Sequence, residues 1–225
     1  CAVKTMLGKE LECSHLFGEL PQDVIISNLR EQAGMDPKVR QASNPLLHVQ
    51  KPHSSAAEEK RNLVIIVEES MGAEFVGHLG GRDLTPELDR LAALGLCLSN
   101  CRANGDRTIR GLEALLLGLT QTPGRGVTKL GSPPQGFFSL PALLRSYGYS
   151  TSFIYAGDKN FDYMWDFFEK IGFDRVFDED SFKKEAFRGP WGVCDGVLLE
   201  KAHSIFEEVV QEPFFSLVLT TSVHD

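Results

Sequence analysis

Two oxygen-bearing side chains stand where a parallel α/β sheet would place a catalytic site. Glu69 follows a buried-type apolar run at 63–67, and Thr108 begins a segment with helical apolar spacing. A carboxylate that leaves a buried strand is a natural ligand for a hard cation, because its charge is costly near a core. The N-terminus of a helix favours an anion, so it would stabilise a threonine alkoxide and a phosphoryl group bonded to it. A cation held by Glu69 would also activate the Thr108 hydroxyl as a nucleophile.

Two arginines flank this threonine. Arg107 precedes Thr108 directly and Arg110 follows it by two positions, so both guanidinium groups are candidates for holding phosphate oxygens. The alternatives are ordinary structural roles: a solvated loop position for Glu69, an N-cap for Thr108, and surface salt bridges for the two arginines. Taken residue by residue, these alternatives stay open.

The surrounding sequence alternates between strand and helix patterns. The run at 63–67 is continuous and β-branched, which is typical of a strand buried on both faces of a parallel sheet. Thr85 and Pro86 resemble a helix N-cap and first helical position, and Gly95 a helix stop. The pattern predicts strands at 63–67, 96–100, 151–155, 175–177 and 214–220, and helices at 86–94, 109–119, 140–147, 163–171 and 196–210. We therefore predict an α/β fold, a mostly parallel sheet sandwiched by helices.

Ligands of such sheets gather outside the carboxyl ends of the strands, so the residues after each strand are candidate site residues. Besides Glu69 and the segment leading to Thr108, these are the residues at 157–160, which include Asp158, and at 221–225, which include His224. We therefore expect polar side chains that follow these strands to lie at the carboxyl edge of the predicted sheet.

The composition and net charge of the chain argue against several classes of function and of site. The 225 residues carry a net charge of -8, which argues against general nucleic-acid or anionic-membrane binding. The five cysteines are an odd number without CxxC spacing, so they signal neither a zinc site nor a disulfide framework, and Cys97 and Cys101 are expected in the core. No apolar run is long enough to span a membrane, and we expect the chain as given to be soluble.

The domain organisation follows from a change of pattern near residue 60. Residues 1–60 are proline-punctuated and end in a polar stretch, so we predict a partly helical arm and linker, followed by a catalytic domain at 61–225. The chain starts without methionine and stops just after its last predicted strand. We expect it to be a piece of a longer protein, with the sheet incomplete at its C-terminal side.

Several ordered motifs carry a resemblance to a known family. The segments 62–70 (NLVIIVEES), 85–91 (TPELDRL) and 104–114 (NGDRTIRGLEA) resemble the lipoteichoic acid synthase and phosphoglycerol transferase branch of the alkaline phosphatase and sulfatase superfamily. The likeness continues through 153–158, 160–162, 172–174, 191–195 and 214–224, and so covers about 61–225.

The resemblance implies a mechanism and a role for each matching residue. Glu69 would bind a catalytic divalent metal, Mn²⁺ before Mg²⁺ or Zn²⁺, and Thr108 would be both metal ligand and nucleophile. Thr108 would attack the phosphorus of phosphatidylglycerol and release diacylglycerol, and a glycan or glycerol-phosphate acceptor would then take the phosphoglycerol group. His224, Asp158 and Asp162 would contact the substrate, as would Arg107 and Arg110. The family implies a domain of a bacterial membrane protein on the extracytoplasmic, periplasmic face.

The chain departs from the family pattern in one main respect. Members complete the metal site with a downstream Asp-His pair, and the sequence ends before such a segment, so we expect the fragment to be inactive. Alternative hypotheses are a sulfatase, a phosphoethanolamine transferase, and a non-catalytic relative that only binds ligand. The sulfatase is disfavoured because the segment starting at Cys101 lacks the proline and arginine of C/S-x-P-x-R.

Overall fold

The computed structural model describes residues 18–32, 59–120, 126–130, 138–158, 164–208 and 211–223. The chain divides into two compact units, residues 1–59 and 60–225. Within the first unit the described element is helix α3 (Gln22–Gln32), and the other parts of the predicted arm lie largely outside the described residues. The second unit carries the sheet and the candidate site.

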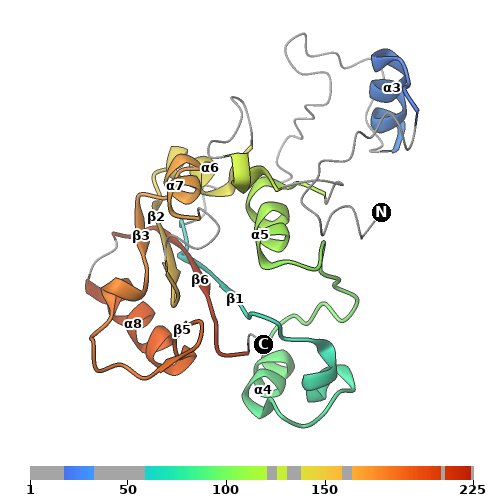
Figure 1. Cartoon of the computed structure of the whole chain (residues 1–225). Helices are drawn as coiled ribbons and strands as arrows, with labels where there is room; N and C mark the ends of the chain where they lie inside the picture. The colour runs from blue at the N-terminus through green and yellow to red at the C-terminus, as the bar shows by residue number, and fades with distance from the viewer. Residues whose placement is uncertain are drawn as a thin grey trace. The chain divides into compact units, whose positions relative to one another are not determined.

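A four-stranded, fully parallel sheet forms the centre of the second unit (Figure 1). Its strands are β1 (Leu63–Val67), β2 (Ser150–Tyr155), β3 (Arg175–Phe177) and β6 (Phe214–Leu219), in the spatial order β1-β6-β2-β3. The register pairs Val67 with Leu219 and Leu219 with Tyr155, so the carboxyl ends of three strands lie at one level. The predicted parallel α/β architecture is confirmed.

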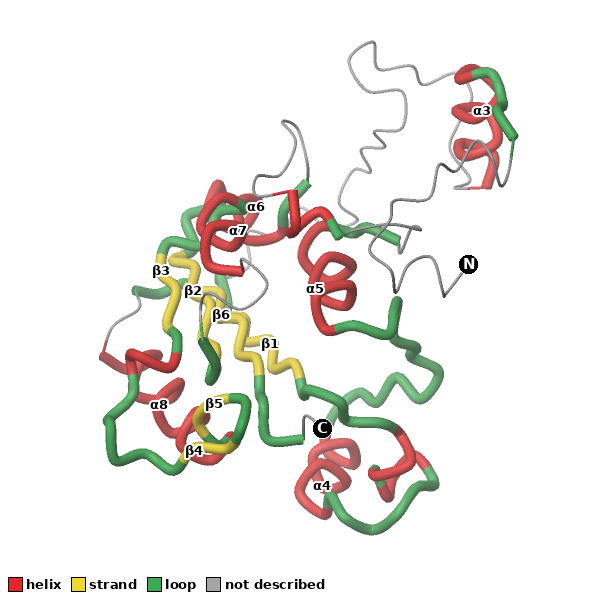
Figure 2. The backbone as a smooth tube through the Cα atoms, in the orientation of Figure 1, coloured by secondary structure: helices red, strands yellow, loops and turns green. Residues whose placement is uncertain are grey.

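Helices cover both faces of this sheet, because strand residues alternate between two apolar clusters. One cluster joins Phe153 and Phe215 of the strands to helices α5 (Thr108–Leu117), α6 (Leu140–Ser146) and α7 (Met164–Lys170). The other joins Ile154 and Val218 to α8 (Asp195–Glu208). Figure 2 shows α5, α6 and α7 on one side of the yellow strands and α8 on the other.

The connections between the strands and helices contain short, partly irregular elements. Between β1 and α5 lie two 3₁₀ turns, η1 (Ala73–Phe75) and η2 (Gly77–Leu79), and helix α4 (Pro86–Leu94), which begins and ends as predicted. Turn η3 (Val127–Leu130) follows α5, and turn η5 (Glu179–Ser181) follows β3. Strands β4 (Arg188–Gly189) and β5 (Gly192–Val193) form a small antiparallel hairpin that the sequence pattern did not predict.

The predicted strand at 96–100 is wrong. The segment has no regular secondary structure, and Leu96 and Leu98 are 89% and 68% exposed. A short apolar run becomes a strand only where a neighbouring strand completes its hydrogen bonds, and the described sheet provides none here. The expectation that Cys97 and Cys101 lie in the core is wrong for the same reason, since both are exposed.

Candidate active site

The structure brings Glu69 and Thr108 together across 39 positions of sequence. The Thr108 hydroxyl lies 2.8 Å from each carboxylate oxygen of Glu69 and donates its hydrogen bond to them. Both side chains are half-buried. A nucleophile candidate and a cation-ligand candidate therefore share one point at the carboxyl edge of the sheet.

Thr108 is the first residue of α5, not its N-cap. The N-cap is Arg107, whose side chain makes no capping bond, and its carbonyl accepts from the amides of Arg110 and Gly111 at 2.9 and 3.2 Å. The Thr108 hydroxyl is therefore not used to cap the helix. The amides of the first turn and the helix dipole favour an anion at this end of α5.

The backbone of Glu69 is held from the neighbouring strand end. Its amide donates to the Thr220 hydroxyl at 2.8 Å, and Thr220 lies just after β6 and is 1% exposed. Ser70 next to it adopts a left-handed backbone, with φ of 55°, and its hydroxyl lies 3.4 Å from a Glu69 carboxylate oxygen. A non-glycine residue in that region is strained, so the surrounding structure must enforce the sharp exit of the chain after Glu69.

Glu68 lies on the other side of the same turn. Partial burial raises the pKa of its carboxyl group, the nearby negative charge of Asp195 raises it further, and a hydrogen bond with Thr220 opposes both effects. A carboxyl group with a raised pKa carries a cost when it is ionised. The Glu68 carboxylate accepts from the Thr220 hydroxyl, whereas the Glu69 carboxylate accepts from the Thr108 hydroxyl.

Asp195 fixes the loop that follows β6. Its carboxylate accepts from the amides of Thr221 at 2.9 Å and Ser222 at 3.1 Å, while its own amide donates to the Ser222 hydroxyl at 2.9 Å. Asp195 is also the first residue of α8, where a negative charge is favoured by the helix dipole. The aspartate thus joins the start of α8 to the end of β6.

Sequence reasoning did not find the roles of Thr220 and Asp195. Their partners lie 151 and 26 positions away, and only the sheet order brings them together. The one available signal was position, since both residues adjoin strand ends or helix starts.

Arg110 takes a buried position in α5. It is 9% exposed and pairs with Glu113 at 3.0 Å, and Glu113 also accepts from the amide and hydroxyl of Thr128. The pair ties η3 to α5. A phosphate contact by Arg110 stays a prediction that this ion pair does not favour.

The structure describes two of the other four residues predicted to contact the substrate. Arg107 is exposed directly beside Thr108, and Asp158 is exposed just after β2. His224 and Asp162 lie outside the described residues, so their predicted roles stay predictions.

Gly157, next to Asp158, packs so closely that an added Cβ would lie 2.8 Å from the Trp191 carbonyl oxygen. The β4–β5 hairpin therefore covers this end of β2.

The described residues contain no group of three or more His, Cys, Asp or Glu side chains able to hold a metal ion. Glu69 and Thr108 supply carboxylate and hydroxyl oxygens, which suit hard divalent cations such as Mg²⁺ and Mn²⁺. The donor set fits such a cation in type, with further ligands needed to complete it.

The parallel α/β sheet and the pair at its carboxyl edge define a domain with the alkaline phosphatase superfamily fold. A model of the sulfatase family matches residues 61–225, and the chain belongs to that family. Over 188 residues it is 27% identical to phosphoglycerol transferase I of Escherichia coli, covering 79% of this chain and 25% of that protein. The resemblance stated from the sequence motifs is confirmed.

Two solved structures are similar to the chain. A protein in the alkaline phosphatase superfamily from Vibrio parahaemolyticus has a TM-score of 0.81 and 37% identity, over 93% of this chain and 51% of that one. The lipoteichoic acid synthase LtaP from Listeria monocytogenes has a TM-score of 0.63 and 21% identity, over 88% and 47% of the two chains. The chain thus spans about half of these structures and a quarter of the curated relative.

These relatives place the chain in a family of enzymes that includes a phosphoglycerol transferase. Among the described helices, none is long and apolar enough to cross a bilayer.

Proposed function

We propose that this chain carries the nucleophile half of a metal-dependent phosphoglycerol transferase. The observation that carries the proposal is the Thr108 hydroxyl, held at the start of α5 and 2.8 Å from both carboxylate oxygens of Glu69. The homology to phosphoglycerol transferase I supports the same reaction class.

In the proposed reaction Thr108 Oγ1 attacks the phosphorus of phosphatidylglycerol. The bond from Thr108 oxygen to phosphorus forms, the bond from phosphorus to the diacylglycerol oxygen breaks, and the Thr108 proton ends on diacylglycerol. An acceptor hydroxyl then attacks the same phosphorus and gives its proton back to the threonine oxygen. Splitting the transfer into two displacements is the advantage of a covalent intermediate.

Helix α5 would stabilise the charge on the transferred group. The amides of its first turn would donate to the phosphoryl oxygens of a group bonded to Thr108, and Arg107, which is exposed and directly precedes Thr108, would contribute its positive charge. Asp158, Asp162 and His224 are proposed to contact the glycerol and phosphate of the substrate.

Glu69 and Thr108 would hold the divalent cation, with Mn²⁺ the proposed ion and Mg²⁺ or Zn²⁺ the alternatives. When bound, the cation would increase the acidity of the Thr108 hydroxyl and offset negative charge at the phosphorus. Its other ligands would come from residues outside the described part of the chain. Without them the chain is proposed to be inactive by itself.

The proposed setting is the periplasmic face of a bacterial inner membrane, as a domain of a membrane protein. The partners would be a phosphatidylglycerol head group and a glycan or glycerol-phosphate acceptor.

The experiment that tests this proposal compares Thr108→Ala with wild type in the full-length protein. Release of diacylglycerol from phosphatidylglycerol is measured with and without Mn²⁺. We expect Mn²⁺-dependent release by wild type and a loss of at least about a thousandfold in the variant, since nucleophile removal commonly costs that much. Thr85→Ala, at another helix start, is the matched control and should keep full turnover. Equal turnover by Thr108→Ala and wild type would remove Thr108 from the mechanism.

A further inference from the structure

Strand β1 forms an open edge of the described sheet. It pairs with β6 on one side, and among the described residues no strand pairs with its other side. The Val67 carbonyl accepts from the Thr220 amide at 3.1 Å, so the backbone polar groups of Val67 point toward β6. Because these groups alternate along a strand, the amides and carbonyls of Val64 and Ile66 point to the open side. Such a row of unpaired groups is a template for another strand.

One face of β1 is also uncovered. Ile65 and Val67 pack against the apolar cluster under α5, α6 and α7. Val64 and Ile66 alternate with them and therefore point to the face of the sheet that carries α8. They are 39% and 49% exposed, and neither belongs to the apolar cluster under α8 or packs against it.

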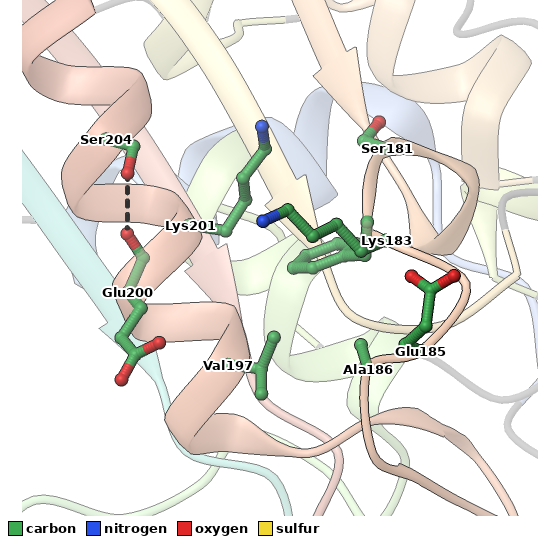
Figure 3. Close-up of a pocket in the computed structure, with 9 residues that line it drawn as sticks. Ser181, Lys183, Glu185, Ala186, Val197, Glu200, Lys201 and Ser204 are labelled. Atoms are coloured by element: carbon green, nitrogen blue, oxygen red, sulfur yellow. Dashed lines mark hydrogen bonds between the residues drawn. The ribbon is translucent and has the colours of Figure 1, made fainter.

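The cover that α8 provides ends at β6. Val218 of β6 lies beside Ile66 in the sheet, is 1% exposed and belongs to the α8 cluster. On the β3 side, the segment 181–186 lies against α8, as Figure 3 shows, and Phe182 and Ala186 of that segment extend the cluster. The α8 cluster thus has a described neighbour on the β3 side and stops one strand short on the β1 side.

The composition of β1 is that of an internal strand. Its five residues, Leu63–Val67, are all apolar and mostly β-branched, a pattern typical of strands that have neighbours on both sides and cover on both faces. Natural edge strands are usually protected by a charged residue or a proline, and β1 carries neither. The chain spans about half of the similar structure from Vibrio parahaemolyticus, so a protein of that kind has an equally large part that could supply the neighbour.

We propose that β1 is an internal strand of the full-length protein. The part of that protein outside residues 1–225 adds a strand to the open side of β1 and a helix that covers Val64 and Ile66 beside α8. A second copy of this chain fits less well. In an antiparallel pair of two β1 edges, the uncovered faces of both copies would lie side by side and still lack a helix. The proposal does not depend on the function proposed for Thr108.

Hydrogen exchange of the full-length protein tests the open side of β1. Exchange is measured residue by residue, by mass spectrometry with electron-transfer fragmentation, and the amides of Ile65 and Val67, which point toward β6, are the internal reference. We expect the amides of Val64 and Ile66 to exchange within about tenfold of that reference, because both sides of β1 are then hydrogen-bonded. Faster exchange than this at Val64 and Ile66 would show an open edge and overturn the proposal.

Photo-crosslinking identifies the occupant. A photo-reactive amino acid replaces Ile66 in the full-length protein, and the crosslinked peptides are identified by mass spectrometry. We expect a crosslink to a peptide outside residues 1–225 of the same molecule. The matched control carries the photo-reactive amino acid at Leu143 of α6, which is 40% exposed, and should not capture that peptide. Crosslinks from position 66 that are found only within residues 1–225, to a second copy or to another protein would overturn the proposal.

Discussion

Removing the carboxylate of Asp195 should loosen the junction between α8 and β6. The carboxylate accepts two backbone amides, from Thr221 and Ser222, and stands at the positive end of the α8 dipole. A hydrogen bond to a charged group contributes about 1.5 to 3 kcal/mol, and a charge at a helix end about 0.3 to 1 kcal/mol. Asp195 is half-buried, so the lower part of each range applies.

Two substitutions at Asp195 distinguish the stabilisation that comes from its negative charge from the stabilisation that comes from its hydrogen-bond acceptors. Asp195→Asn keeps one acceptor oxygen and should lower the free energy of unfolding by about 1 to 2 kcal/mol. Asp195→Ala removes both acceptors and should cost about 3 kcal/mol. For a unit of this size each kcal/mol corresponds to about 2 to 4 °C in Tm. Urea unfolding followed by circular dichroism gives the free energies, with Asp83→Ala, at an exposed position before α4, as the comparison.

A double-mutant cycle with Ser222→Ala tests whether the bonds act together. The Ser222 hydroxyl accepts from the Asp195 amide while the Ser222 amide donates to the carboxylate, so the two residues share one network. We expect a coupling free energy of about 0.5 kcal/mol or more. The reasoning is refuted if Asp195→Ala unfolds at the same urea concentration as wild type, or if the two substitutions are additive.

Three further predictions concern the support of the site. Thr220→Val should lower the free energy of unfolding by about 1 to 3 kcal/mol in urea titrations, because the Glu69 amide loses its acceptor. Glu68→Gln should gain stability over wild type as pH rises above 4.5, since burial raises the folded pKa and ionisation then costs only the wild type. If the free energies of unfolding of Glu68→Gln and wild type, measured with EDTA present, changed equally with pH, this prediction would be contradicted. Arg110→Met should cost about 3 to 5 kcal/mol by removing the cation that pairs with the buried Glu113 carboxylate, and a loss below 1 kcal/mol would argue against the buried pair.

The sequence predicted those elements whose signals are local. The strand at 63–67 is recognisable from five consecutive apolar residues, and α4 from Thr85, Pro86 and Gly95. The expected burial of that strand on both faces is wrong, because β1 is an edge strand of the described sheet and Leu63, Val64 and Ile66 are exposed. Glu69 was predicted to lie at the carboxyl edge because it follows a strand of a parallel sheet. Thr108 was placed there by the predicted strand at 96–100, which the structure does not contain. That their side chains are in direct contact is a result of the structure.

The rest depended on pairing between distant segments. The order β1-β6-β2-β3 places β6 beside β1 although about 150 residues separate them, and no local pattern encodes that. The β4–β5 hairpin has two-residue strands, too short for any periodicity. The wrong strand at 96–100 shows the converse, since its apolar run has local strand character without a partner strand.

The most direct test of the central claim is to trap the threonine intermediate. The full-length protein is incubated with phosphatidylglycerol and Mn²⁺, quenched in acid, digested, and examined by mass spectrometry for the peptide containing Thr108. We predict a glycerophosphate adduct on Thr108 that is absent from Thr108→Val, from samples with EDTA, and from Glu69→Gln. Turnover of phosphatidylglycerol with an unmodified Thr108 and an adduct on another residue would contradict the account.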